Sequence, residues 1–177
     1  MMLSVAGGNL VIVQGNEEEH QMFDCTIRLL GKSNTEFDFT AFIETAGESP
    51  VIVETASDID YTFAKTGITI LFSKPYSRFT MVIFHLKTAT FDGGRVDCYR
   101  SDLLESIECT DSRAQVKRKI GLEQISSNIS HGCEESLIVD TYKLGGNKIK
   151  IAYSQLSNQL RSITGFYDTS QLIPCFD

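Results

Sequence analysis

Residues 78–86, RFTMVIFHL, form the most continuously apolar run in this sequence. Both alternating sets of side chains in the run are hydrophobic, which is typical of a strand covered on both faces. The run therefore predicts a central, doubly covered strand. His85 lies near its end, and we expect this histidine to be a buried structural group. The segment 101–129 is the expected cover of the second face, which gives a sheet with an added helical or looped layer.

Alternating apolar and polar segments follow one another along the rest of the chain, separated by Gly, Pro, Asn and Ser. This pattern predicts strands at 9–14, 22–30, 36–44, 51–53, 59–63, 68–72, 95–100, 136–144, 148–154 and 160–167. Residues 22–44 predict an antiparallel hairpin, and Gly145-Gly146-Asn147 predicts a tight turn between two strands. Spacing of about 8 to 12 residues between short strands is typical of an antiparallel sandwich or barrel.

The region between residues 101 and 132 is ambiguous in its periodicity. Asp102 can cap a short helical turn, because its carboxylate can accept hydrogen bonds from free backbone N–H groups. We expect a strand near 114–121 and a short helix near 122–130. The sequence therefore predicts a mainly β fold: a single domain, residues 1–177, forming a β-sandwich or barrel of about ten short strands, with one or two short helices between residues 101 and 132.

Size and charge limit the classes of function. A chain of 177 residues with 42% hydrophobic residues can bury a core without disulfides or metal. Its net charge of −7 argues against nucleic acid and anionic membranes as partners. The basic cluster Lys117-Arg118-Lys119 is expected to be a solvated face. No apolar window approaches the length of about 18 residues that a membrane span needs.

Compartment is predicted from the N-terminus and the cysteines. Residues 1–8 lack the basic and apolar regions of a secretory signal, which favours the cytoplasm. Cys25 is expected to be buried among Phe23 and Ile27, as a small hydrophobic side chain. The remaining cysteines allow three disulfide pairings, and they are Cys98, Cys109, Cys133 and Cys175. Reduced thiols are expected; if the cysteines are paired, a periplasmic or secreted location follows.

The segment His131-Gly132-Cys133 places a base and a nucleophile close together. A cysteine enzyme needs an imidazole within hydrogen-bond reach of the sulfur and a third group that orients it. No family motif surrounds the pair, so no catalytic residue is assigned. CxxC spacing is absent, and neither a metal nor a cofactor is expected.

Acidic groups supply the candidate binding residues. They are Glu17, Glu18, Glu19, Asp58, Asp60, Glu134 and Glu135. Asp58 and Asp60 are expected on one face of a strand, about 7 Å apart. Acidic clusters of this kind accelerate encounter with a basic protein partner.

Three functions are compatible with the sequence. The first is a non-enzymatic binding protein, such as an inhibitor, an immunity-type protein or an adaptor, that contacts another protein through acidic loops or an exposed sheet face. The second is a barrel that holds a small apolar ligand among its 11 Phe and 6 Tyr residues. The third is an enzyme that uses His131 or Cys133 with partners distant in sequence.

Overall fold

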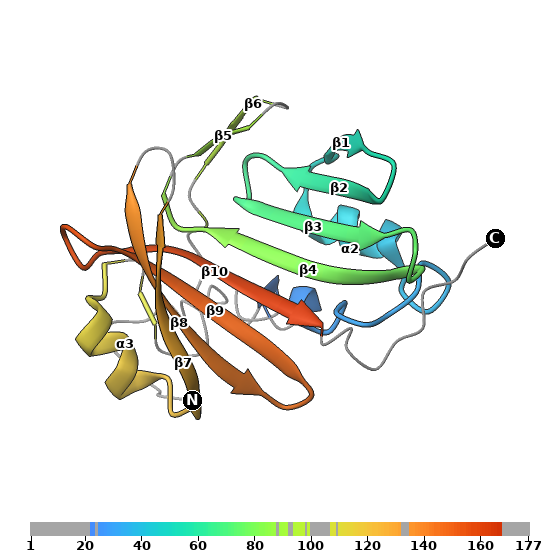
Figure 1. The fold of residues 1–177 in the computed structure, drawn as a ribbon. Helices are drawn as coiled ribbons and strands as arrows, with labels where there is room; N and C mark the ends of the chain where they lie inside the picture. The colour runs from blue at the N-terminus through green and yellow to red at the C-terminus, as the bar shows by residue number, and fades with distance from the viewer. Residues whose placement is uncertain are drawn as a thin grey trace, which may run out of the picture.

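The computed structural model describes residues 22–23, 25–87, 89–91, 94–97, 99, 107–108, 110–131 and 135–167. These residues form one antiparallel sheet of eight strands, in the order β1-β2-β3-β4-β10-β9-β8-β7, and a separate ribbon of β5 and β6 (Figure 1). The strands are β1 (Val51–Glu54), β2 (Asp58–Phe63), β3 (Ile68–Ser73), β4 (Arg78–His85), β5 (Ala89–Phe91), β6 (Gly94–Val96), β7 (Gln124–His131), β8 (Ser136–Leu144), β9 (Asn147–Ser154) and β10 (Leu160–Tyr167).

The prediction of a mainly β, antiparallel fold with short helices is confirmed. The large sheet stays open and does not close into a barrel. β4, at the predicted central strand, pairs with β3 on one side and β10 on the other. His85 is 5% exposed, as expected of a structural group. The strands predicted at 9–14 and the helical turn after Asp102 lie outside the described residues.

The sheet consists of two halves with the same order of elements. The helix α2 (Phe39–Ala46) precedes the meander β1–β4, and the helix α3 (Arg113–Lys119) precedes the meander β7–β10. The last strands of the two halves, β4 and β10, pair along the middle of the sheet. In Figure 1, β2–β4 run across the view whereas β7 and β8 run from top to bottom, so the sheet twists strongly between its halves.

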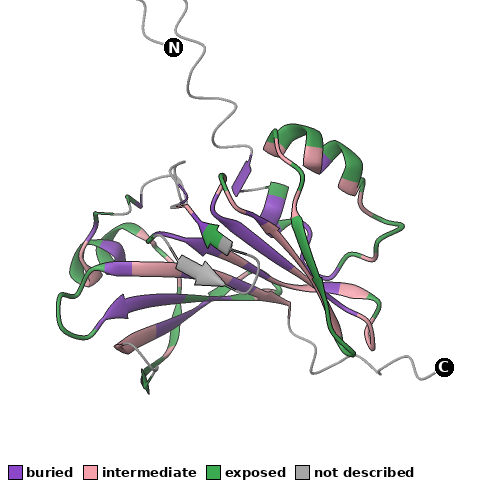
Figure 2. Ribbon diagram, turned by 90° about the horizontal axis from the view of Figure 1, so that it is seen from above, coloured by how far each residue is buried: buried purple, intermediate pink, exposed green. Residues whose placement is uncertain are grey.

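One face of the sheet, called here the core face, carries the hydrophobic core. Its buried side chains come from both halves, for example Phe63, Ile70 and Phe84 from the first and Ile151 and Ile163 from the second. Both helices pack on this face, through Phe42 of α2 and Val116 of α3, and Tyr99 stacks edge-on against Phe84. Figure 2 shows the buried residues mostly along the strands of the sheet, whereas the helices are mainly exposed or intermediate.

The predicted hairpin at 22–44 is wrong: the described residues of this range contain two helical segments and no strand. Residues 22–23 and 25–27 are helical, and α2 replaces the second expected strand. The side chains Phe39, Phe42, Ile43 and Ala46 have helical spacing, and this set packs against the core. Asp38 caps the start of α2 by accepting from the Ala41 N–H at 3.0 Å, and Gly47 ends the helix in a left-handed conformation. Cys25, expected to be buried, is exposed and unpaired.

The strand and the helix expected at 114–130 occur in the opposite order. Ser112 and Gln115 form a reciprocal capping box that starts α3. A strand is expected here because Val116 and Ile120 also fit a strand alternation. The helix stops before Gly121, which has a φ of +58°. Residues 124–131 form the strand β7 in place of the expected helix. Ile125 and Ile129, expected to form a buried stripe on that helix, are exposed on this edge strand.

Two glycines let the N-terminal helical segment lie against β10. A Cβ on Gly165 would lie 2.8 Å from the Cδ1 atom of Ile27. The helical residues 25–27 can therefore pack this closely on β10 only because residue 165 has no side chain. Gly31, at φ +82°, faces the ring of Tyr167 and donates its N–H to the carbonyl of Phe79 at 2.8 Å. The N-terminal segment is thereby joined to both central strands of the sheet.

Candidate functional site

The second face of the sheet, called here the open face, has no covering layer among the described residues. The described helix of the expected cover at 101–129 does not lie on this face, because α3 packs its buried residue Val116 on the core face; residues 101–106 and 109 lie outside the described residues. Six apolar side chains of the open face are half-buried, and none of the six belongs to the core cluster; they are Leu71, Met81, Ile83, Leu137, Val139 and Phe166. A contiguous apolar patch on a protein surface often marks a site of interaction.

The strand register arranges the open face in rows that cross the sheet. One row runs through directly paired residues in the order Val53, Asp60, Leu71, Met81, Phe166, Lys148 and Lys143. A neighbouring row runs through Val51, Thr62, Thr69, Ile83, Thr164, Lys150, Thr141 and Ser126. Each row therefore has an apolar or hydroxyl-bearing centre, and the first has a carboxylate in one half and amines in the other.

The two halves of the open face differ in charge. Asp58 and Asp60 lie on this face of β2, which confirms that they share one side of a strand. Burial raises the pKa of Asp60 above its ordinary value, and the neighbouring Asp58 raises it further. On the other half, Lys150 stands over the ring of Phe166, with its Nζ 4.5 Å from the ring centre.

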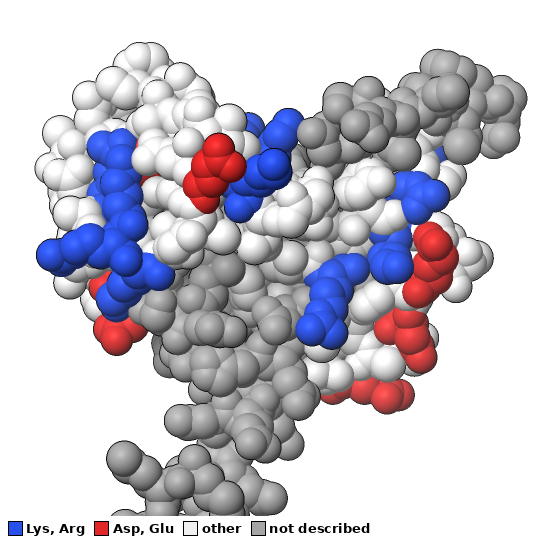
Figure 3. Space-filling view, turned by 90° about the horizontal axis from the view of Figure 1, so that it is seen from below, with Lys and Arg blue, Asp and Glu red and all other residues white. Residues whose placement is uncertain are grey.

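The charge difference extends to the whole of the second half. Residues 110–167 contain eight Lys and Arg against five Asp and Glu, although the chain carries a net charge of −7. Figure 3 shows Lys and Arg side chains gathered on the left of the view, the side on which Figure 1 places α3, and mixed charges on the right. The chain therefore has a basic half within an acidic whole.

His85 is a buried residue of β4 on the open face, where β4 pairs with β10. Its Nε2 lies 3.1 Å from the hydroxyl of Thr69, the neighbouring residue on β3. Burial lowers the pKa of His85 to about 4, so its ring is neutral at neutral pH. The histidine is therefore a structural group and not a proton donor in the physiological range.

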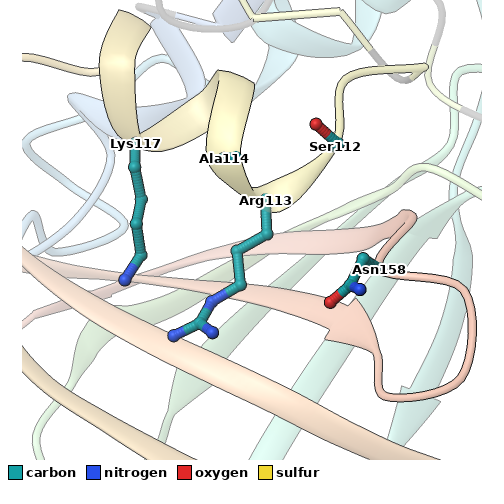
Figure 4. Close-up of a pocket in the computed structure, with 5 residues that line it drawn as sticks. All are labelled: Ser112, Arg113, Ala114, Lys117 and Asn158. Atoms are coloured by element: carbon teal, nitrogen blue, oxygen red, sulfur yellow. The ribbon is translucent and has the colours of Figure 1, made fainter.

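A polar pocket lies beside α3, between its first turn and the β9–β10 connection. It has a volume of about 320 Å³ and is lined by Ser112, Arg113, Ala114, Lys117 and Asn158. Figure 4 shows that Arg113 and Lys117 both extend from the helix toward the sheet. There the guanidinium of Arg113 donates two hydrogen bonds of 2.7 Å to Asp140, and the Lys117 Nζ lies 3.7 Å from the same carboxylate.

Asp140 is fully buried at the centre of this network on the core face. Burial acts to raise its pKa, but the hydrogen bond from Arg113 and the nearby Lys117 outweigh this effect and lower the pKa below its ordinary value. The buried Tyr142 and Tyr153 lie beside it, and mainly burial raises the pKa of both phenols. The cations that line the pocket thus hold α3 on the sheet, which gives them a structural role.

The other predicted site residues do not form one site. Glu135 is paired with Arg161 at 2.6 Å, and this hydrogen bond lowers the pKa of its carboxyl group. His131 lies at the end of the edge strand β7, with its Nδ1 2.9 Å from the hydroxyl of Ser136. The remaining predicted site residues lie outside the described part of the chain; they are Glu17, Glu18, Glu19, Cys133 and Glu134.

The residues that sequence reasoning missed are the basic and apolar members of the rows, above all Met81, Phe166, Lys148 and Lys150. The alternation of Lys148 and Lys150 with the buried Ile149 and Ile151 does indicate a two-sided strand. Only the register, however, places Lys148 across from Phe166, which in turn lies across from Met81.

Among the described residues, no group of three or more His, Cys, Asp or Glu side chains is placed to hold a metal ion. Within the same residues, no helix has the combination of length and apolar character that crossing a membrane requires.

No protein-family model matches the sequence, and no curated protein matches it. The solved structures that match include two bacterial proteins. The chain is 10% identical to a cysteine-rich secretory protein from Staphylococcus aureus, with a TM-score of 0.48 over 80% of this chain and 45% of that one. It is 7% identical to an extracellular protein containing an SCP domain from Bacillus anthracis, with a TM-score of 0.49 over 94% of this chain and 50% of that one. The chain thus spans about half the length of each, and TM-scores below 0.5 identify no family.

Proposed function

We propose that the chain is a protein-binding module that receives its partner on the open face of the sheet. The observation that supports the proposal is the first row described above, which has an apolar centre, a carboxylate in one half and amines in the other. Half-buried Met81, Ile83 and Phe166 lie in the middle of the sheet, apart from the core cluster. A protein partner that covers them removes apolar surface from water, which is the main driving force for association.

The charges of the face define the chemistry of the partner. Basic side chains of the partner would lie opposite Asp58 and Asp60, and acidic side chains would lie opposite Lys148 and Lys150. Such a bipolar arrangement fixes the orientation of the partner and accelerates encounter. The partner is therefore two-sided in charge, in contrast to the purely basic partner expected from the acidic loops.

The rival functions lack comparable support. The small-ligand function requires a lumen, and the sheet does not close into a barrel. The enzyme function requires groups around His131, whose described hydrogen-bond partner is the hydroxyl of Ser136. Cys133 lies outside the described residues.

The experiment compares face variants for binding to one purified partner. Proteins retained by the wild-type chain from an extract of its source cells are identified, purified and measured against the single variants Met81→Ala and Phe166→Ala. We expect each variant to raise the dissociation constant by about tenfold, because large side chains at the centre of an interface contribute most of the binding free energy. The charge reversal Lys148→Glu should mainly slow association, and more so at low salt.

Leu156→Ala is the matched control, because Leu156 is 92% exposed in the β9–β10 connection and lies off the open face. Its affinity should equal that of the wild type. Full affinity in both face variants, or loss in the control alone, would show that the partner binds elsewhere.

A further inference from the structure

The two edge strands of the large sheet differ in how well they are protected. β1 has four residues, follows Pro50 and ends at Glu54, which pairs with Lys74 at 2.7 Å. β7 has eight residues, QISSNISH, with no proline, lysine, arginine or carboxylate. Natural edge strands are usually short, charged or interrupted, because an open edge offers unpaired N–H and C=O groups to another strand. Among the described residues, the pairing of β7 is interrupted only by a register shift between Gln124 and Ser126, and residues 127–131 have none of these protections.

The register shows which backbone groups of β7 point outward. Lys143 on β8 donates its N–H to Glu123, just before β7, and Ser136 on β8 accepts from Gln155 beyond β9. Odd-numbered residues of β8 therefore face β7, and they pair with Ser126, Asn128 and Ser130. Ser127 and Ile129 alternate with these residues, so their N–H and C=O groups point away from the sheet.

Side chains beside this edge favour a partner of particular chemistry. Ile129 is 53% exposed on the core side of β7, opposite Ile138, and it offers an apolar contact. The helix α3 lies over the same side, because the Arg113 guanidinium donates to the hydroxyl of Ser127 at 2.9 Å. One carboxylate, Asp140, serves both Arg113 and Lys117.

This leaves α3 with excess positive charge beside the open edge. Lys119 is matched by Asp111 at 2.8 Å, but the exposed Arg118 makes no ion pair with any described residue. A second copy of the chain pairing edge to edge would be related by a two-fold axis, and both α3 helices would then lie on the same face beside the junction. Their like charges oppose such a dimer, whereas carboxylates next to the edge are favoured.

We propose that β7 accepts an extended, acidic segment of another protein as a ninth, antiparallel strand of the sheet. Ser127 and Ile129 form the backbone hydrogen bonds, Ile129 receives an apolar side chain of the segment, and carboxylates of the segment lie toward Arg118 and Lys117. Strand addition of this kind obtains affinity from main-chain hydrogen bonds and specificity from alternate side chains. The edge is separate from the open face and does not depend on a partner there.

The experiment selects peptides from a displayed random library on the intact wild-type chain. We expect the enriched peptides to carry an excess of Asp and Glu over Lys and Arg, to bind less tightly as salt rises, and to slow the amide exchange of Ser127 and Ile129. Two edge variants test the position: Ile129→Glu brings a repelling charge, and Ile129→Pro removes an outward donor. Each should weaken binding of a selected peptide by about tenfold or more.

Ile52→Glu is the matched control, because Ile52 is 58% exposed on the other edge strand, β1, and receives the same substitution. Binding to this variant should equal that of the wild type, and urea unfolding should show that all three variants are folded. The proposal is overturned if no peptide is enriched, if the enriched peptides are neutral or basic, or if the edge variants bind them fully. It is also overturned if the wild type alone sediments as a dimer that Ile129→Glu dissociates.

Discussion

His85 and Asp140 are both buried and ionisable, but they differ in charge: the histidine is neutral and the aspartate is ionised. His85 has a hydroxyl neighbour, Thr69, and burial keeps its ring neutral. Asp140 has a guanidinium and an amine beside it, and these keep the carboxylate charged although it is fully buried. The carboxylate of Asp140 stays charged because opposite charge and hydrogen bonds compensate its loss of water.

His85 makes the stability of the protein depend on pH. Its pKa is about 4 in the folded protein and about 6.5 in the unfolded chain, so the unfolded chain binds more protons between these values. The free energy of unfolding should therefore be highest above about pH 6.5 and fall by up to about 3 kcal/mol toward pH 4 from this group. Urea unfolding of the wild type and of His85→Gln across this range measures the effect.

The glutamine in that variant can still hydrogen-bond to Thr69 but does not titrate. Its free energy of unfolding should vary less steeply with pH than that of the wild type, while every other ionisable group is shared by the two proteins. Equal slopes between about pH 4 and pH 6.5 would mean that His85 is protonated inside the fold.

At the scale of elements, the contact between the N-terminal segment and β10 depends on Gly31. A side chain there would meet two costs, the left-handed φ of +82° and a Cβ 2.3 Å from the ring of Tyr167. Gly31→Ala should therefore lower the free energy of unfolding by about 3 kcal/mol. Gly47→Ala is the matched control: its φ is +67° but nothing lies within 4 Å, so it should lose only about 1 to 2 kcal/mol.

The double variant Gly31→Ala/Tyr167→Leu separates these two costs. If the ring contact is responsible for the larger loss, the smaller leucine should recover part of the stability that Gly31→Ala loses relative to its own Tyr167→Leu parent. Equal losses for Gly31→Ala and Gly47→Ala in chemical unfolding would show that the ring moves aside freely and that conformation alone matters.

The elements predicted correctly from the sequence are those in which alternation and turn chemistry agree. The strands at 136–144, 148–154 and 160–167 match β8, β9 and β10 closely, and Gly145-Gly146 marks their first turn. The strand predicted at 36–44 is wrong because Phe39 and Ile43 fit both a strand alternation and a helical spacing. The Asp38 cap and the left-handed Gly47 determine which period is realised.

The candidate site was predictable only in part, for a reason of the same kind. The carboxylates of β2 share a face because neighbours two apart in a strand always do. The row that joins Asp60 to Lys148 through Met81 and Phe166 crosses five strands, and it depends on pairing between β4 and β10, about 80 residues apart in sequence. A single sequence contains no local signal for that pairing.

At the scale of the whole molecule, the two halves share one core, and the expectation of a single domain becomes testable. Ile70 in β3 and Ile149 in β9 are both fully buried members of the same core cluster, on opposite sides of the β4–β10 seam. Ile70→Val and Ile149→Val should each lower the free energy of unfolding by about 1 kcal/mol. In a cooperative domain, the slowest-exchanging amides open only by global unfolding.

Native-state hydrogen exchange followed by mass spectrometry should therefore show that either substitution accelerates the slowest amides of both halves equally. Acceleration confined to β1–β4 for Ile70→Val, and to β7–β10 for Ile149→Val, would mean two units that open independently. The seam favours the cooperative outcome, because β4 and β10 pair directly and Phe84 and Ile163, opposite each other across it, are both fully buried. A sheet that opens as one unit also keeps the rows of the open face in register, which a partner spanning both halves requires.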